Sequence, residues 1–185
     1  MSEQKKQLKE AIKREYAKCA QDPTYFLGKY GIIQHPVKGK VNFNLYDFQE
    51  KALHSFMKSD YNIVLKARQL GLSTLTAGYA LWMMTFQQDK NILVIATKQD
   101  TAKNLVTKVR VMHANLPGWL KQPCVEDNKL SLRYRNGSQI KAVASSDESG
   151  RSEALSLLII DEAAFIDRID RIWAASQQTL ATGGR

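Results

Sequence analysis

The stretch at residues 63–76 constrains the fold of this chain more than any other part of the sequence. It reads Ile-Val-Leu-Lys-Ala-Arg-Gln-Leu-Gly-Leu-Ser-Thr-Leu-Thr. The apolar run Ile63 to Leu65 predicts a buried strand, and the apolar stretch from Ser73 to Phe86 predicts a helix that is buried on most sides. A basic segment at residues 66–71 connects them. A strand, a loop with glycine and a helix that opens on serine are typical of a phosphate-binding loop.

The loop departs from the usual pattern G-x-x-x-x-G-K-[ST] at two positions. Lys66 stands where the first glycine belongs, and Leu72 stands where the lysine belongs. Since leucine carries no charge, we expect Lys66 or Arg68 to supply the positive charge toward the phosphates. At a spacing of two residues in an extended segment, these side chains project to the same side. The alternative is that both point to solvent and that the site is weak or inactive.

The start of the predicted helix supplies the rest of the phosphate site. Glycine allows the backbone to approach a phosphate closely, and the N–H groups at a helix N-terminus favour anions. The hydroxyl of Ser73 is in the position that binds magnesium in such loops. The predicted phosphate-binding residues are Lys66, Arg68, Gln69, Gly71, Leu72, Ser73 and Thr74.

A second motif lies about ninety residues downstream, where the apolar run Leu155 to Ile160 ends on Asp161 and Glu162. Ligands of α/β proteins bind at the carboxyl ends of parallel strands. We therefore expect Asp161 to bind Mg²⁺, directly or through water, and Glu162 to polarise an attacking water as general base. The alternative is a strand that meets a surface loop with two solvated acids, and the phosphate loop upstream weighs against it.

The remaining pattern predicts an α/β protein with a mainly parallel sheet, because strands and helices alternate along the chain. The dipeptide Asn136-Gly137 is a strong hairpin signal between two short strands. The predicted elements are helices at 3–20, from Tyr46, and at 100–114 and 166–180, a strand at 91–96, and hairpin strands at 129–134 and 139–144.

The net charge of +9 is unevenly distributed. Residues 1–60 carry 11 basic and 7 acidic side chains, residues 61–120 carry 7 and 2, and residues 121–185 carry 9 of each. A basic first two thirds suits an acidic partner such as nucleic acid, although solubilising lysines on solvated helices would give the same count. The two cysteines and three histidines form no zinc-binding pattern. No signal peptide or membrane-spanning run is visible, so we expect a soluble protein in a reducing compartment.

Several segments together resemble the N-terminal ATPase part of the large terminase subunit of tailed phages, the DNA-packaging motor. The phrase Arg68-Gln69-Leu70-Gly71-x-Ser73-Thr74 resembles the variant phosphate loop of that family, in which a basic residue early in the loop replaces the usual lysine. Leu45-Tyr46-x-Phe48-Gln49 resembles its adenine-binding motif. Asp22-Pro23, Ile33-Gln34-His35-Pro36, Ala96-Thr97-Lys98 and Gly150-Arg151-Ser152 also fit, and the resemblance spans about residues 15–185.

The resemblance implies a P-loop NTPase (RecA/helicase-like) core that binds ATP and Mg²⁺. It implies a helical lead-in at residues 1–44 and a partial ATPase domain at residues 45–185. The family continues with further core strands and a nuclease domain, so we expect a sheet that is incomplete at the C-terminal side and no nuclease domain. The implied function is ATP hydrolysis that powers translocation of double-stranded DNA into a capsid.

By resemblance, Tyr46 packs on the adenine and Gln49 reads its edge. Arg151 would act as an arginine finger in a neighbouring subunit; the alternative is a surface arginine that pairs with Asp147 or Glu148. The implied partners are double-stranded DNA, further copies in a homo-oligomeric ring, a portal and a small terminase subunit. The implied location is the cytoplasm of an infected bacterial host.

Two other functions remain open from the sequence. A superfamily 2-like helicase shares the Asp-Glu strand end, but Leu72 and the Ile33-Gln34-His35-Pro36 segment argue against it. A non-catalytic DNA-binding or assembly remnant would also have a basic surface. It would bind DNA with a steep salt dependence and turn over no ATP.

Overall fold

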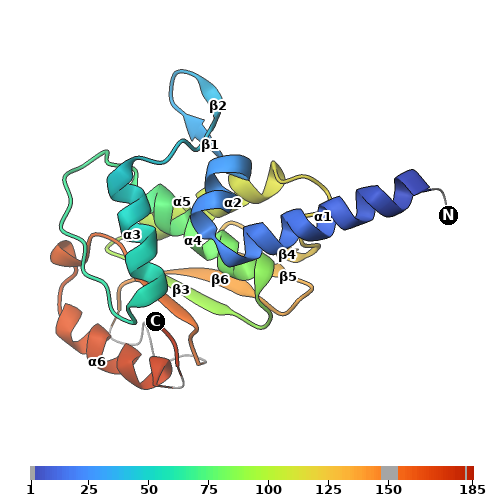
Figure 1. Ribbon diagram of the computed structural model, residues 1–185. Helices are drawn as coiled ribbons and strands as arrows, with labels where there is room; N and C mark the ends of the chain where they lie inside the picture. Colours follow the sequence, from blue (N-terminus) through green and yellow to red (C-terminus); the bar gives the residue numbers. More distant parts are fainter. Residues whose placement is uncertain (1–2, 147–153, 182) are drawn as a thin grey trace.

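The computed structural model describes residues 3–146, 154–181 and 183–185 (Figure 1). The helices are α1 (Glu3–Gln21), α2 (Pro23–Tyr30), α3 (Asp47–Lys58), α4 (Leu72–Phe86), α5 (Gln99–Ala114) and α6 (Ile169–Leu180), with a short 3₁₀ helix, η1 (Ala163–Phe165). The strands are β1 (Ile32–His35), β2 (Gly39–Asn42), β3 (Asn91–Ala96), β4 (Cys124–Asp127), β5 (Ser131–Tyr134), β6 (Gln139–Ala144) and β7 (Leu157–Ile160).

The main sheet has the strand order β4-β5-β6-β3-β7. Strands β6, β3 and β7 are parallel, with Val94 of β3 opposite Ala142 on one side and Ile159 on the other. Strand β5 is antiparallel to β6, and β4 is antiparallel to β5. The predicted strand at 91–96, the predicted strand that ends at Ile160 and the predicted hairpin are therefore confirmed. Strand β4 extends the sheet beyond them, and the sheet as a whole is mixed.

Helices cover both faces of this sheet, with α4 and α5 on one face and α6 on the other (Figure 1). Side chains of a strand alternate between the two faces, and β3 follows this rule. Ile92 and Val94 belong to the large apolar cluster with α4 and α5, whereas Leu93 and Ile95 belong to a smaller cluster with α6. The domain is thus a three-layer α/β/α arrangement.

Helix α4 lies at the centre of the larger cluster. Its residues are apolar on nearly all sides of the helix, since α4 packs between the sheet and the N-terminal helices. Trp82 Nε1 donates to the carbonyl of Cys19 at 2.9 Å, which joins α4 to the end of α1. With 15 residues α4 is too short to span a bilayer, and none of the described helices is both long and apolar enough to do so.

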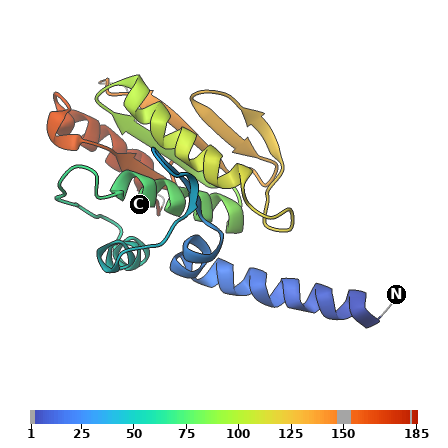
Figure 2. The ribbon, with the colours of Figure 1, turned by 90° about the horizontal axis from the view of Figure 1, so that it is seen from above.

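Helix α1 extends away from the rest of the molecule at its amino end (Figure 2). Residues 3–11 are all exposed, and contact with the body begins in the later turns. There Cys19 is buried, and the ring of Tyr16 packs edge to face on the ring of Phe86 in α4, with the two ring centroids 5.0 Å apart. The predicted amphipathic helix is confirmed, and only its second half is anchored.

The predicted buried strand at residues 63–65 is wrong. The connection between α3 and α4 runs as an extended arc on the outside of the molecule (Figure 1), and Ile63 and Leu65 are fully exposed. A strand forms only where a neighbour offers backbone donors and acceptors. The free side of β7 is taken by Arg185, whose carbonyl accepts from Leu158 N at 2.6 Å and whose N–H donates to Ser156 O at 3.1 Å. The apolar run therefore has no strand beside it.

Candidate functional site

The first turn of α4 and the end of β7 meet at the carboxyl edge of the parallel strands. Ser73 Oγ donates a hydrogen bond to Asp161 Oδ2 at 2.8 Å, across 88 residues of sequence. Both side chains are partly buried. Two different motifs in the sequence predict Ser73 and Asp161 as ligands of one metal ion. In the structure these two side chains lie side by side.

The backbone fixes the position of the Asp161 carboxylate. The N–H of Asp161 donates to Ile95 O at 2.9 Å, so the β3–β7 ladder continues one residue past the end of β7. Oδ1 of Asp161 accepts from the N–H of Glu162 at 3.1 Å, while Oδ2 accepts from Ser73. The carboxylate is held on both oxygens, and its orientation is set before any ligand arrives.

Glu162 adopts a left-handed backbone conformation, with φ 56° and ψ 39°. Residues other than glycine occupy this region at a cost of about 1–3 kcal/mol, and such strain is concentrated at functional sites. Glu162 comes directly after Asp161 in the sequence, and its side chain is exposed. An exposed carboxylate at this edge is able to accept a proton from a water molecule, as a general base requires.

The loop ahead of α4 is exposed from residue 61 to residue 70. Gln69 and Gly71 both have positive φ, at 63° and 70°. The carbonyl of Gly71 accepts from the N–H groups of Thr74 and Leu75, which closes the first turn of α4 beneath the loop. The helix N-terminus then directs its partial positive charge to this side.

The positions proposed for the missing lysine differ in their environment. Leu72 is 6% exposed and packs in the main core, so its side chain turns away from the loop and its backbone alone is available to a phosphate. Lys66 and Arg68 are both exposed on the arc. Which of the two supplies the charge stays a prediction.

The start of α3 also reaches this loop. Gln49 is 2% exposed; its Oε1 accepts from the N–H of Tyr46 at 3.1 Å, and its Nε2 donates to Leu70 O at 3.0 Å. Tyr46 and Phe48 are exposed and stack with ring centroids 5.7 Å apart and planes 8° apart. A flat aromatic surface of this kind is able to stack on a base. Of the two predicted adenine residues, Gln49 therefore contacts the predicted phosphate loop directly, and Tyr46 is joined to it through Gln49. Their role at adenine stays a prediction.

Other predicted site residues are placed differently. Lys98 follows β3 at the same edge and is the N-cap of α5. Arg151 and its possible partners Asp147 and Glu148 lie outside the described residues. The sequence analysis assigned no role to Phe48 or to the carbonyl of Leu70. An aromatic residue two positions after Tyr46 could have indicated Phe48 as a stacking partner. A backbone carbonyl such as that of Leu70 has no recognisable pattern in a sequence.

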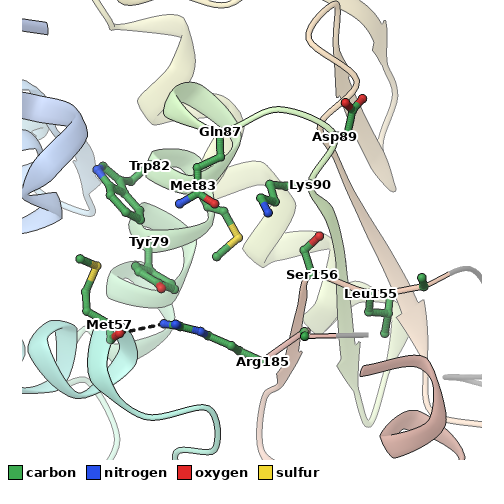
Figure 3. A pocket seen from close by; sticks show the side chains of 13 residues that line it. Met57, Tyr79, Trp82, Met83, Gln87, Asp89, Lys90, Leu155, Ser156 and Arg185 are labelled. Atoms are coloured by element: carbon green, nitrogen blue, oxygen red, sulfur yellow. Dashed lines mark hydrogen bonds between the residues drawn. The ribbon is translucent and has the colours of Figure 1, made fainter. Parts of the chain in front are cut away.

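A cleft of about 460 Å³ lies elsewhere, between the ends of α3 and α4 and the starting ends of β3 and β7 (Figure 3). Tyr79 and Met83 face Lys90 and Ser156 across it, and Arg185 reaches toward α3. Because strands start at this edge and end at the edge with Asp161, the cleft and the candidate site lie at opposite ends of the sheet. The cleft therefore does not coincide with the candidate site.

The site and the fold together define an α/β domain with a phosphate-loop-like turn facing a carboxylate at the carboxyl edge of its parallel strands. The model of the family "Terminase large subunit, T4likevirus-type, N-terminal" matches residues 63–185. The chain belongs to this family, which confirms the resemblance seen in the sequence and disfavours the helicase alternative.

Two solved structures are similar in fold. The large terminase of bacteriophage HK97 matches with a TM-score of 0.67 and 19% identity, over 86% of this chain and 35% of that chain. An ATPase-domain mutant of the large terminase of Thermus phage P74-26 matches with a TM-score of 0.59 and 21% identity, over 76% of this chain and 62% of that chain. This chain thus spans about a third of the HK97 protein.

Proposed function

We propose that this chain forms the nucleotide-binding part of a phage DNA-packaging motor. It binds ATP with Mg²⁺ and, within a longer protein, hydrolyses ATP to drive double-stranded DNA into a capsid. The observation that carries the proposal is the contact of Ser73 Oγ with Asp161 Oδ2 at 2.8 Å. It joins the helix N-terminus that suits phosphate to the carboxylate that suits a cation.

The donor set fits magnesium. Mg²⁺ prefers oxygen ligands and is usually bound by one or two protein groups together with water and phosphate oxygens. Ser73 and Asp161 offer a hydroxyl and a carboxylate side by side, and in the described part of the chain no cluster of three or more His, Cys, Asp or Glu residues competes as a metal site. When bound, the ion would neutralise charge on the phosphate oxygens.

The chain's own groups divide the remaining work. The N-terminus of α4 binds phosphate oxygens through its N–H groups, and Lys66 or Arg68 adds positive charge. Tyr46 stacks on the adenine and Gln49 contacts its edge. Glu162 takes the proton of the attacking water, and Arg151 of a neighbouring copy stabilises the charge that develops on the γ-phosphate.

The proposed assembly follows from the family. The lead-in covers residues 1–44 and is not wholly helical, because α1 and α2 are followed there by the antiparallel pair β1 and β2. Residues 45–185 form part of the ATPase domain. Copies assemble as a ring on a portal, together with a small terminase subunit, in the cytoplasm of an infected bacterial host. The basic first two thirds of the chain supports contact with double-stranded DNA, because phosphate neutralisation by lysine and arginine supplies most of non-specific affinity.

Binding of MgATP to this chain, measured by titration calorimetry, tests the proposal. We expect Ser73→Ala to weaken binding by about tenfold or more, equivalent to ~1.4 kcal/mol. Thr107→Ala is the matched control, since it removes a hydroxyl from the exposed face of α5, where it bonds the carbonyl of Lys103. Equal affinity of Ser73→Ala and wild type, or ATP binding that is unchanged by removal of Mg²⁺, would contradict the proposed site. DNA binding without any ATP binding would support the non-catalytic alternative.

A further inference from the structure

The phosphate loop holds an unusual backbone conformation with little side-chain support. Gln69 and Gly71 are both left-handed, and Leu70 lies between them. For a residue other than glycine such a conformation persists only when the surrounding structure enforces it. The side chains of residues 66–70 are exposed, so core packing does not enforce it here.

Gln49 contacts this loop at its most constrained point. Its Nε2 donates to the carbonyl of Leu70 at 3.0 Å, directly between the two left-handed residues. A Cβ atom on Gly71 would lie 2.8 Å from the same Nε2, so the amide would have to shift from this position if residue 71 had a side chain. The loop and the start of α3 are thus joined by one buried amide.

The other end of the amide is fixed as well. Oε1 of Gln49 accepts from the N–H of Tyr46, which is the N-cap residue of α3. This is the reach of an N3 glutamine back to the N-cap, as in a capping box. One partner is a donor and the other an acceptor, so together they determine which way the amide faces.

We propose that Gln49 is a positioning residue that holds the phosphate loop in its binding conformation by anchoring the Leu70 carbonyl to the N-terminus of α3. This role rests on the proposed nucleotide site and adds to the contact with the adenine edge proposed above. It requires that loss of the tether weakens binding of a triphosphate that has no base. If Gln49 acted through the adenine contact alone, binding of such a ligand would be unaffected.

Two substitutions separate the tether from other effects. Gln49→Glu keeps the size of the side chain and an oxygen that accepts from Tyr46, but it turns a second oxygen toward the Leu70 carbonyl in place of a donor. Gln49→Met removes both polar contacts without adding charge. Gln88→Glu is the control, because it adds the same charge at an exposed position beyond the far end of α4.

The first measurement needs no ligand. Amide hydrogen exchange reports local opening, and we expect both Gln49 variants to speed exchange at residues 69–72 by about tenfold relative to wild type. Amides in the middle of α4, at residues 79–83, should exchange as in wild type. Loop exchange that is unchanged, or that rises only in step with α4 because the whole domain is destabilised, would overturn the proposal.

The second measurement uses inorganic tripolyphosphate with Mg²⁺ beside MgATP. Both variants should lose about tenfold in affinity for both ligands. A loss confined to ATP would assign Gln49 to adenine recognition alone and overturn the positioning role. If wild type binds neither ligand, the proposed nucleotide site has failed, and the exchange experiment still decides whether Gln49 holds the loop.

Discussion

Gly71 meets two requirements at the residue scale, one set by its backbone and one by its neighbour. Its φ of +70° is a conformation that costs a residue with a Cβ about 1–2 kcal/mol. The hydrogen in place of a Cβ also leaves room for Gln49 Nε2. A single glycine therefore permits both the turn into α4 and the contact with α3.

We expect Gly71→Ala to lower the free energy of unfolding by about 1–2 kcal/mol. Gly28→Ala is the matched control, because Gly28 lies exposed inside α2 with no atom near its missing Cβ, and alanine there should stabilise by about 0.5–1 kcal/mol. Urea denaturation of both variants measures the difference. A Gly71→Ala variant that is as stable as wild type, or more stable, would show that the backbone of Gly71 is not constrained as described.

The sequence predicts those residues of the candidate site whose side chains belong to a recognisable motif. The loop ahead of the helix predicts Ser73 as a metal ligand, and the acidic end of the apolar run at 155–160 predicts Asp161. The two side chains are in hydrogen-bond contact. The partners of Gln49 were not predictable, since one is a backbone carbonyl 21 residues away. Contacts to main-chain atoms leave no residue type to recognise in the sequence.

At the scale of elements, α1 and α2 are joined through one carboxylate. Glu15 Oε1 accepts from Lys29 Nζ at 2.7 Å, from Tyr25 Oη at 2.8 Å and from Tyr30 Oη at 2.9 Å. The bond from Lys29, followed by that from Tyr25, lowers the pKa of Glu15 to about 2. Three donors from α2 thus favour the ionised form of a residue on α1.

This contact makes the docking of α1 sensitive to acid. Because the pKa of Glu15 is lower in the folded chain, its stabilisation is complete above about pH 4.5 and is lost as the pH falls toward about 2. We expect Glu15→Gln to melt below wild type at pH 7, with the gap narrowing between pH 4.5 and pH 2. Thermal melts across this range measure it.

The control for this prediction is Glu10→Gln on the same helix. Glu10 is exposed and pairs with Lys13 at 3.0 Å, and exposed pairs of this kind contribute little. Its melting temperature should follow wild type at every pH. A gap for Glu15→Gln that stays constant down to pH 2 would indicate lost packing rather than lost charge.

The elements differ in how well the sequence predicted them. Strand β6 has the predicted bounds because Asn136 and Gly137 mark the turn before it. Strand β4 was missed, since its four residues are all exposed and show no alternation. Strand β4 forms because β5 offers it a pairing partner. Its strand conformation therefore depends on β5 and is not specified by the four residues of β4 themselves.

At the scale of the whole molecule, the outer side of β7 is joined to α3 by Arg185. Its backbone pairs with Ser156 and Leu158, and its Nη1 donates to the carbonyls of Phe56 and Met57 at 3.1 and 2.8 Å. Cationic groups bind well at the C-terminal end of a helix, where carbonyls lack partners. This link lies beside the cleft, and the exposed residues 61–70 run outside it.

The run at residues 63–65 resembles β7 in composition, yet only β7 has a neighbouring strand. Leu158 of β7 lies opposite Leu93 of β3, whereas Ile63 and Leu65 are fully exposed. An apolar run by itself does not specify a strand; the pairing does, and the pairing depends on parts of the chain that are distant in sequence. This is the physical reason why the predicted strand at residues 63–65 is wrong, while the apolar run at residues 155–160 contains strand β7.

A matched pair of leucine substitutions tests this arrangement. Leu65→Ala should change the free energy of unfolding by less than about 0.5 kcal/mol, because an exposed side chain loses no packing. Leu75→Ala in α4, where the leucine is fully buried, should cost about 2–5 kcal/mol. Both values come from the same denaturant titration. A cost for Leu65→Ala close to that for Leu75→Ala would mean that the run at 63–65 is buried in this chain in solution, as its sequence alone predicts.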